Sequence, residues 1–200
     1  ELVDSYVKAT DWRVKENSTV TYSVGGLILN NSGAITANYW LSEIYDDEIA
    51  NAHKNGDLHI HDLSMLTGYC AGWSLKQLIQ EGLGGVVGKI TSKPASHLAT
   101  LCNQMVNFLG IMQNEWAGAQ AFSSFDTYLA PFVKVDNLDY DQVKKCVESF
   151  IYGVNTPSRW GTQAPFSNVT LDWTVPNDLA EMNCIIGGKE VDFKYKDCKK

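Results

Sequence analysis

The sequence predicts an α/β fold, because regions with helical periodicity alternate with short runs typical of strands. The strongest helical signal lies between residues 96 and 120, where apolar residues recur at intervals of three and four. A second helical region at residues 139–153 opens with a capping pair, Asp139 and Gln142. Residues 57–62 instead alternate strictly between polar and apolar, as a strand does. No internal repeat or low-complexity linker divides the chain, so we expect one continuous unit.

The N-terminal part of the chain is predicted to hold one strand and two helices. A β-like run covers residues 19–24 and ends at a glycine pair. Thr36 is a good cap for the first helix. The residues that this helix is expected to bury are Tyr39, Trp40 and Ile44. The second helix runs through residues 48–52 and stops at Asn55-Gly56, a pair typical of helix ends.

Two further helices are predicted in the middle of the chain. Ser74 is expected to cap a helix that ends at Gly82. The long helix from Ser96 to about Gln120 places its apolar residues on one face. This face consists of Leu98, Leu101, Cys102, Met105, Leu109, Met112 and Trp116. The small residues 117–119 at its end are suited to close contact with another backbone.

A last helix is predicted from Asp139 to about Gly153, followed by loops and short strands. The residues that this helix is expected to bury are Val143, Cys146, Val147, Phe150 and Ile151. Beyond Asn155 the chain holds three prolines and β-like runs such as Val169–Trp173. Helices that alternate with isolated strands complete the α/β pattern.

Composition and charge exclude several classes of protein. Hydrophobic residues make up 44% of the chain and aromatic residues 11%, which is enough for a packed core. The formal net charge of −7 argues against nucleic acid or an anionic membrane as a partner, although it permits a small phosphorylated ligand. We find neither an apolar run of the ~18 residues that a membrane span needs nor a signal-peptide pattern. The five cysteines are odd in number and widely spaced, so we expect a reducing, cytoplasmic location.

The pair His59 and His61, together with Asp57, is one candidate site. On a strand these side chains point to the same side, an arrangement that a metal ion can use. Two histidines that are hydrogen-bonded at a strand end, without a metal ion, would show the same spacing. The sequence holds only two other histidines, His53 and His97, so it has no further histidine-rich cluster. A metal-dependent hydrolase and a site without metal therefore both remain open.

Cys70 is a second candidate, within the sequence Gly68-Tyr-Cys-Ala-Gly-Trp73. Small and aromatic neighbours beside a polar strand would suit a reactive thiol in a cavity. Such reactivity requires the thiolate or a radical. The alternative is that Cys70 is a small buried hydrophobic side chain.

Two further segments could contact a phosphorylated ligand. The glycine-rich run at 82–88 lacks the dinucleotide-binding spacing, so a flexible connection is the simpler interpretation, with Lys89 and Lys93 available to a phosphate. The segment 155–168 offers side chains suited to a sugar or phosphate. These are Arg159, Gln163, Ser167 and Asn168. Polar loop residues that satisfy their own backbone are the alternative.

Five phrases stand in order along the chain. They are Asn55-Gly-Asp-Leu-His-Ile-His-Asp62, Tyr69-Cys-Ala-Gly-Trp73, Gln113-Asn-Glu-Trp-Ala-Gly-Ala-Gln120, Phe125-Asp-Thr-Tyr-Leu-Ala-Pro131 and Arg159-Trp-Gly-x-Gln-x-Pro-Phe-x-Asn168. They are accompanied by Asp11-Trp12, Glu16-Asn17 and the turn Ile185-Ile-Gly-Gly188. Together these phrases resemble the anaerobic, class III ribonucleoside-triphosphate reductases, and the similarity covers essentially the whole chain.

The resemblance implies the N-terminal portion, residues 1–200, of a catalytic ten-stranded α/β barrel of the glycyl-radical type, helix-rich in this part. It also implies radical-based reduction of ribonucleoside triphosphates to deoxyribonucleoside triphosphates without oxygen, for DNA synthesis. In this family a radical stored on a C-terminal glycine passes to a loop cysteine, which removes the ribose 3′ hydrogen. The 2′ hydroxyl then leaves as water, and formate is the usual reductant.

The resemblance also assigns roles to single residues. Cys70 matches a second catalytic cysteine, which lies on the first barrel strand and serves in the reduction. His59 and His61 would lie on the strand that enters the same cavity, as polar support rather than metal ligands, so no metal is expected in this chain. Arg159 and Asn168 are the other expected substrate contacts.

Several family features have no match here: the glycyl-radical loop, its loop cysteine, the C-terminal zinc site and the N-terminal ATP-binding cone. Cys184 and Cys198 stand in the wrong context for these roles. We therefore expect a fragment that is inactive alone, with the glycyl radical and zinc on the C-terminal part.

The resemblance implies four kinds of partner: ribonucleoside triphosphate substrates, nucleotide effectors, a radical-SAM activase and a second copy in a homodimer. By position, the helices from Ser74 and Ser96 are the expected effector region. The alternative functions are a metal-dependent hydrolase that uses His59 and His61, and a non-catalytic nucleotide-binding module.

Overall fold

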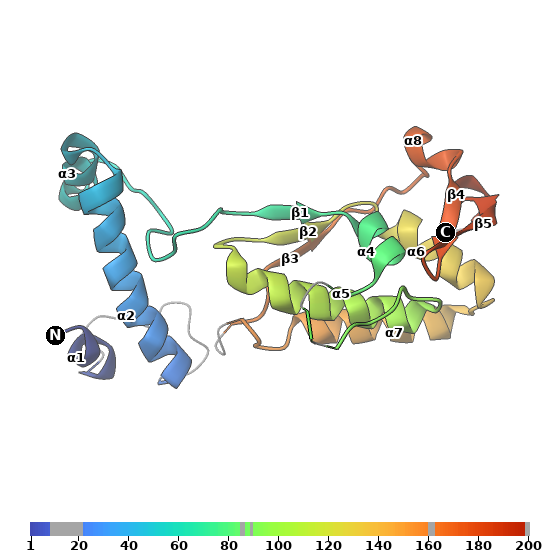
Figure 1. Cartoon of the computed structure of the whole chain (residues 1–200), viewed down its shortest axis with the longest axis horizontal. Helices are drawn as coiled ribbons and strands as arrows, with labels where there is room; N and C mark the ends of the chain where they lie inside the picture. Colours follow the sequence, from blue (N-terminus) through green and yellow to red (C-terminus); the bar gives the residue numbers. More distant parts are fainter. Residues whose placement is uncertain (9–21, 85–86, 89, 160–162, 199–200) are drawn as a thin grey trace.

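The computed structural model describes residues 1–8, 22–84, 87–88, 90–159 and 163–198, and it combines helices with two small sheets (Figure 1). The helices are α1 (Leu2–Lys8), α2 (Val24–Tyr39), α3 (Asp47–Asn55), α4 (Leu75–Glu81), α5 (Leu98–Met112), α6 (Phe125–Val135), α7 (Tyr140–Val154) and α8 (Asn177–Ala180). Short turns of other helix types are η2 (π, Trp40–Ile44), η3 (3₁₀, Gln113–Glu115) and η4 (3₁₀, Tyr195–Asp197). The strands are β1 (Ala71–Trp73), β2 (Gln120–Phe122), β3 (Ser167–Val169), β4 (Asn183–Ile186) and β5 (Lys189–Lys194).

The first sheet is parallel, with the strand order β1-β2-β3, and it confirms the predicted α/β class. Helices α4 and α5 connect β1 to β2, and α6 and α7 connect β2 to β3. Helices α5 and α7 pack together below the strands in Figure 1. The second sheet is the antiparallel hairpin β4–β5, whose turn requires positive φ at Gly187 (59°) and Gly188 (77°).

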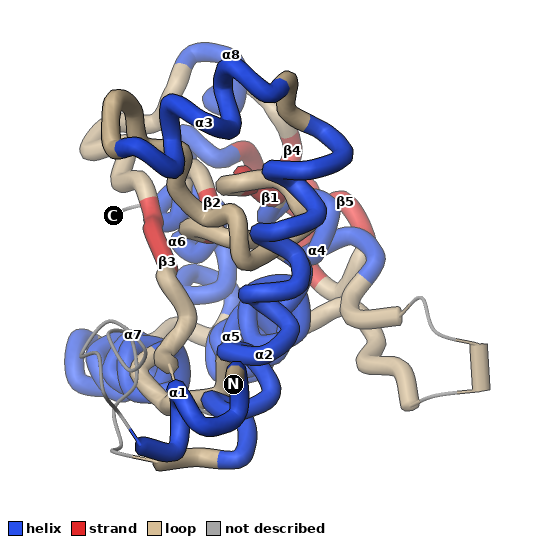
Figure 2. The backbone as a smooth tube through the Cα atoms, turned by 90° about the vertical axis from the view of Figure 1, so that its left-hand side faces the viewer, coloured by secondary structure: helices blue, strands red, loops and turns tan. Residues whose placement is uncertain are grey.

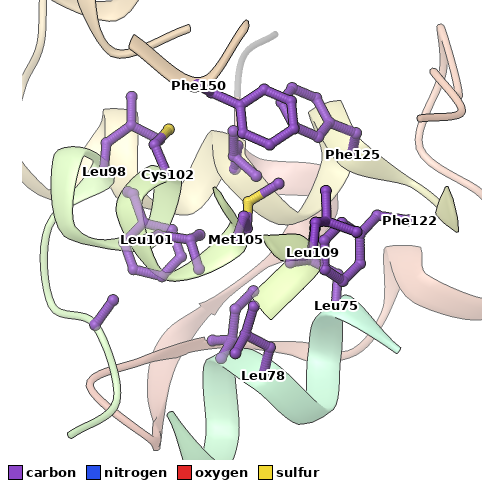
Figure 3. Close-up of a cluster of buried hydrophobic side chains, with 14 of the residues drawn as sticks. Leu75, Leu78, Leu98, Leu101, Cys102, Met105, Leu109, Phe122, Phe125 and Phe150 are labelled. Atoms are coloured by element: carbon purple, nitrogen blue, oxygen red, sulfur yellow. The ribbon is translucent and has the colours of Figure 1, made fainter. Parts of the chain in front are cut away.

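The hydrophobic core lies between this parallel sheet and its helices (Figure 3). As predicted, one face of α5 is buried: Leu98, Leu101, Cys102, Met105 and Leu109. This face packs against three aromatic side chains, Phe122 of β2, Phe125 of α6 and Phe150 of α7. Burial of each such side chain stabilises the fold by roughly 1.5–3 kcal/mol. The predicted burial of Ile151 is wrong, because this residue faces solvent on α7.

The helix starts and stops that depend on local signals were predicted well. Helix α3 ends at Gly56 with φ of 84°. The side chain of Ser74 accepts a hydrogen bond from Gln77 N and begins α4. At the start of α7, Asp139 and Gln142 form a reciprocal capping box.

The predicted helix start at Thr36 is wrong. The cap of helix α2 is Ser23, whose side chain accepts from Gly26 N, and Thr36 lies inside the helix. The Thr36 hydroxyl donates to the carbonyl oxygen of Ser32, four residues back, so it has no capping role. Of the β-like run at 19–24, the first three residues lie outside the described residues, as do the phrases at 11–12 and 16–17, and Val24 is helical.

Helices α1–α3 extend away from the parallel sheet and connect to it through residues 56–70 (Figures 1 and 2). The residues expected to be buried there are not: Tyr39 is 45% exposed, Ile44 is exposed and Trp40 is half-buried. The indole of Trp40, the first residue of η2, donates to Met65 O and thereby attaches η2 to the connecting segment. None of the described helices combines the length and apolarity that crossing a membrane requires.

The strand predicted at residues 57–62 is wrong, because no strand among the described residues pairs with it. The amides of Asp57 and Leu58 donate back to Ala52 O at the end of α3. The amide of Ile60 donates to His53 Nδ1. These contacts satisfy the backbone locally, so the alternating pattern remains in an extended loop.

The helix predicted to reach Gln120 is too long, since α5 ends at Met112 and gives way to η3 and an extended chain at Trp116. The segment 117–119 runs beside residues 68–71, which confirms its predicted backbone contact. Gly118 N donates to Tyr69 O at 2.5 Å, and Ala71 N donates to Ala119 O at 3.1 Å. These two hydrogen bonds draw the chain out of the helix and toward β2.

The strand predicted at Val169–Trp173 is displaced, because β3 covers Ser167–Val169. Beyond it, the carboxylate of Asp172 accepts hydrogen bonds from the hydroxyls of Ser124 and Thr127. Trp173 then has φ of 63°, which ends the extended conformation. Contacts with the start of α6 therefore replace sheet pairing.

Leu101→Ala tests the assignment of the core. Leu101 is fully buried, so we expect the free energy of unfolding to fall by about 2–5 kcal/mol. Ile111→Ala, at a 63% exposed position on the same helix, should change it by less than about 0.5 kcal/mol. Urea denaturation measures both values, and equal effects would contradict the assignment.

Candidate active site

A cavity of about 460 Å³ opens where the strands of the parallel sheet begin. Its lining consists of Asp62, Ser64, Met65, Tyr69, Cys70, Ala117, Gly118, Ala119, Arg159, Gln163 and Phe166. Three distant parts of the sequence thus meet at one place. Three of the residues that the sequence singled out, Cys70, Arg159 and Gln163, are brought together here.

Cys70 is exposed to this cavity rather than buried, so the alternative of a buried hydrophobic thiol is wrong. Its Sγ accepts a hydrogen bond of 3.2 Å from Ala119 N. The contrast with Cys102 is clear: burial raises the pKa of that thiol to about 12. Exposure and a hydrogen bond donated to the sulfur are features of a cysteine that can react.

Arg159 is only 2% exposed, and it acts on the backbone beside Cys70. Its Nη2 donates to the carbonyl oxygens of Trp116 and Ala117, both at 2.6 Å. Burial lowers the pKa of the guanidinium, and the nearby charge of Asp62 partly opposes this. The guanidinium therefore holds residues 116–117, which border the cavity. A contact between Arg159 and the substrate stays a prediction.

Asp62 is a cavity residue that the sequence did not single out, although it ends the phrase that contains both histidines. Its carboxylate forms a hydrogen bond of 2.6 Å with His61 Nδ1. Its φ of 58° is unusual for a residue other than glycine, and such conformations concentrate at functional sites. The His61 ring also lies edge-on to Tyr69, with ring centroids 5.1 Å apart.

The predicted convergence of His59 and His61 on one face is wrong. The ring of His59 lies beside His53, at a centroid distance of 5.6 Å, whereas His61 contacts Asp62 and Tyr69. Within the described residues, no three His, Cys, Asp or Glu side chains are grouped as a metal site would require. The geometry thus gives the hydrolase alternative no support, and a substrate contact by either histidine stays a prediction.

Asn168 lies on the face of the sheet that the helices leave open. It is in register with Ala121 and, one strand further, Gly72. The next residues of the three strands, Trp73, Phe122 and Val169, pack into the core. Because successive side chains of a strand alternate, Asn168 points the other way, and it is exposed.

The cavity continues this open face. The residues two positions before Gly72, Ala121 and Asn168 are Cys70, Ala119 and Phe166, and all three line the cavity. An added Cβ at Gly72 would meet nothing within 4 Å, so the face is unobstructed there. The sheet therefore separates an apolar core from a surface with small and polar side chains that leads to Cys70.

Comparison with solved structures finds the anaerobic ribonucleotide reductase of Thermotoga maritima. Its complex with dATP and CTP matches with a TM-score of 0.63 and 24% identity, over 83% of this chain and 30% of that chain. The form with dATP bound in the specificity site gives a TM-score of 0.62 and 21% identity, over 84% and 32%. The chain thus has the fold of an anaerobic ribonucleotide reductase, and it spans about a third of these structures.

The sequence comparison identifies the family. Residues 16–198 match the model of the family described as anaerobic ribonucleoside-triphosphate reductase. The chain belongs to this family. A comparison with curated proteins gave no match.

Gly118→Ala tests the close backbone contact at the cavity. The added Cβ would lie 2.7 Å from Cys70 Sγ and 2.9 Å from Tyr69 O, so we expect a loss of about 1–3 kcal/mol in unfolding free energy. Gly110→Ala, inside α5 with no atom within 4 Å, should instead gain about 0.5–1 kcal/mol. Denaturation curves that show the same sign for both variants would contradict this geometry.

Proposed function

We propose that the chain is the N-terminal catalytic portion of an enzyme that reduces ribonucleoside triphosphates to deoxyribonucleoside triphosphates under anaerobic conditions, in the cytoplasm. The observation that carries this proposal is the exposed Cys70 thiol in a cavity at the start of the parallel strands. Membership of the reductase family supports the reaction class.

Cys70 is the proposed reducing group of this portion. A thiol has a weak S–H bond and an exchangeable proton, so one side chain can supply a hydrogen atom or a proton to the sugar. The proposed external reductant is formate, which supplies two electrons as it is oxidised to carbon dioxide, while the 2′ hydroxyl leaves as water. The glycyl radical, which would start the reaction by hydrogen-atom abstraction, and the zinc site are proposed to lie in the C-terminal part.

The other cavity side chains suit a polyhydroxylated, negatively charged substrate. The carboxylate of Asp62 can accept hydrogen bonds from ribose hydroxyls, and His61 holds it in place. Gln163, which lines the same cavity from a later segment of the chain, offers a side-chain amide. Arg159 contributes positive charge while it positions residues 116–117, and Asn168 extends the polar surface along the sheet.

A second cavity supports the proposal of nucleotide effectors. It has a volume of about 440 Å³ and lies between α4, residues 82–84 and α5. Trp73 and Phe108 line it, with ring centroids 5.3 Å apart, and aromatic rings suit a nucleobase. Leu83, which lines this cavity, pairs with Ser92. Residues 85–86 of the glycine-rich run and Lys89 lie outside the described residues. A homodimer and a radical-SAM activase complete the proposed assembly.

Cys70→Ala tests the proposed reaction in the chain completed with its C-terminal part and a radical-generating activase. We expect formation of deoxyribonucleotide to fall by at least about 10³-fold, because a transition-state interaction is removed. The glycyl radical, measured by electron paramagnetic resonance, should form as in the wild type. Cys146→Ala, which alters a half-buried thiol of α7, should keep its activity. Full activity of Cys70→Ala would reject the role of this thiol, and nucleotide binding without chemistry in the wild type would favour a non-catalytic module.

Asp62→Asn tests the proposed sugar contact. Removing the charge from one hydrogen-bond acceptor should raise KM for the ribonucleotide about tenfold. Asp57→Asn changes an exposed carboxylate of the same loop that is not among the cavity-lining residues, so its KM should stay unchanged. Steady-state kinetics that show equal KM values for both variants would reject the contact.

A further inference from the structure

Two buried cysteines lie together at the far end of the chain from Cys70, and the proposed reaction uses neither. Cys184 on β4 is 0% exposed, and Cys198, which follows η4, is 7% exposed. Their sulfur atoms are 3.8 Å apart. They share a small apolar cluster with Ala130, Leu179 and Tyr195.

We propose that Cys184 and Cys198 form a reversible dithiol–disulfide site, which small-molecule disulfides oxidise. A disulfide holds its sulfurs about 2.05 Å apart, so the two atoms need to approach by less than about 2 Å. Rotation about side-chain bonds can supply this, because Cys198 follows the 3₁₀ turn and the hydrogen bonds of its thiol are long, at 3.7 Å to Lys194 O and 3.8 Å to Cys184 Sγ. The inference is independent of the proposed function, since neither thiol is among the residues that line the Cys70 cavity.

The surroundings of the two thiols indicate which of them reacts first with the oxidant. Cys198 is the more exposed thiol, and both Lys134 and the hydrogen bond from Cys184 favour its thiolate. Burial, the largest effect, raises the pKa of both thiols, so the thiolate fraction is small and the exchange is slow.

The chemical steps balance with a small disulfide as the oxidant. The thiolate of Cys198 attacks it, expels one small thiol and forms a mixed disulfide. Cys184 loses its proton, attacks the Cys198 sulfur and expels the second small thiol. The two protein thiols thus lose two electrons and two protons, and the oxidant gains both as two thiols.

The new bond would link β4 to the chain beyond η4 and enclose the β4–β5 hairpin. The two cysteines are 14 residues apart. Closing a loop of this size restricts the unfolded chain, so we expect the melting temperature to rise by about 5–10 °C.

The test exposes the protein to oxidised glutathione without oxygen, then alkylates the free thiols and digests with trypsin. Lys189, Lys194 and Lys196 lie between the two cysteines, so trypsin separates their peptides and mass spectrometry detects a link. We expect that link, and the loss of the free thiols of Cys184 and Cys198 in the denatured chain, both restored by dithiothreitol.

Variants make the result specific. Cys198→Ala should lose the link and the rise in melting temperature, whereas Cys146→Ala should keep both. Cys184→Ala removes a fully buried side chain and can destabilise the fold. The proposal is therefore judged by the peptide link in the wild type and by its loss in Cys198→Ala. Free thiols at both Cys184 and Cys198 after prolonged exposure would overturn the proposal. A link between Cys102 and Cys146, or a glutathione adduct that persists on Cys184 or Cys198, would overturn it as well.

Discussion

The close approach of residues 117–119 to residues 68–71 is the constraint on which the rest of the site depends. Hydrogen bonds from Gly118 N and Ala71 N join the two segments and start the pairing of β1 with β2. The same approach places Ala119 N within 3.2 Å of the Cys70 sulfur. A side chain at residue 118 would occupy the space of that sulfur. Arg159 fixes the arrangement from the segment that precedes the third strand, because its side chain donates to the carbonyls of residues 116 and 117.

The division of the sheet into two faces connects packing to chemistry. On one face Phe122 and its neighbours pack on the buried stripe of α5, which makes the strands rigid (Figure 3). On the other face Gly72, Ala121 and Asn168 leave a surface of small and polar groups that leads to Cys70. A rigid support of this kind holds a reactive group in position, and the open face gives a ligand access to it.

Sequence signals predicted those features that depend on neighbouring residues. The caps at Ser74 and Asp139, the end of α3 at Gly56 and the apolar face of α5 all follow from local hydrogen bonds and periodicity. The alternation at residues 57–62 did not predict a strand correctly, because a strand needs a partner and the part of the chain that the structure describes provides none there. The buried Arg159 and the left-handed Asp62 depend on contacts made across the fold, which spacing along the chain does not encode.

The central claim is that the Cys70 cavity binds a ribonucleotide, and protection of this thiol tests it most directly. The protein is alkylated with iodoacetamide under anaerobic conditions, with and without ribonucleoside triphosphates, and each cysteine is followed by mass spectrometry. The account predicts that nucleotide slows the labelling of Cys70 several-fold and leaves that of Cys146 unchanged. An unchanged rate at Cys70 with nucleotide bound, as shown by equilibrium dialysis, would contradict it.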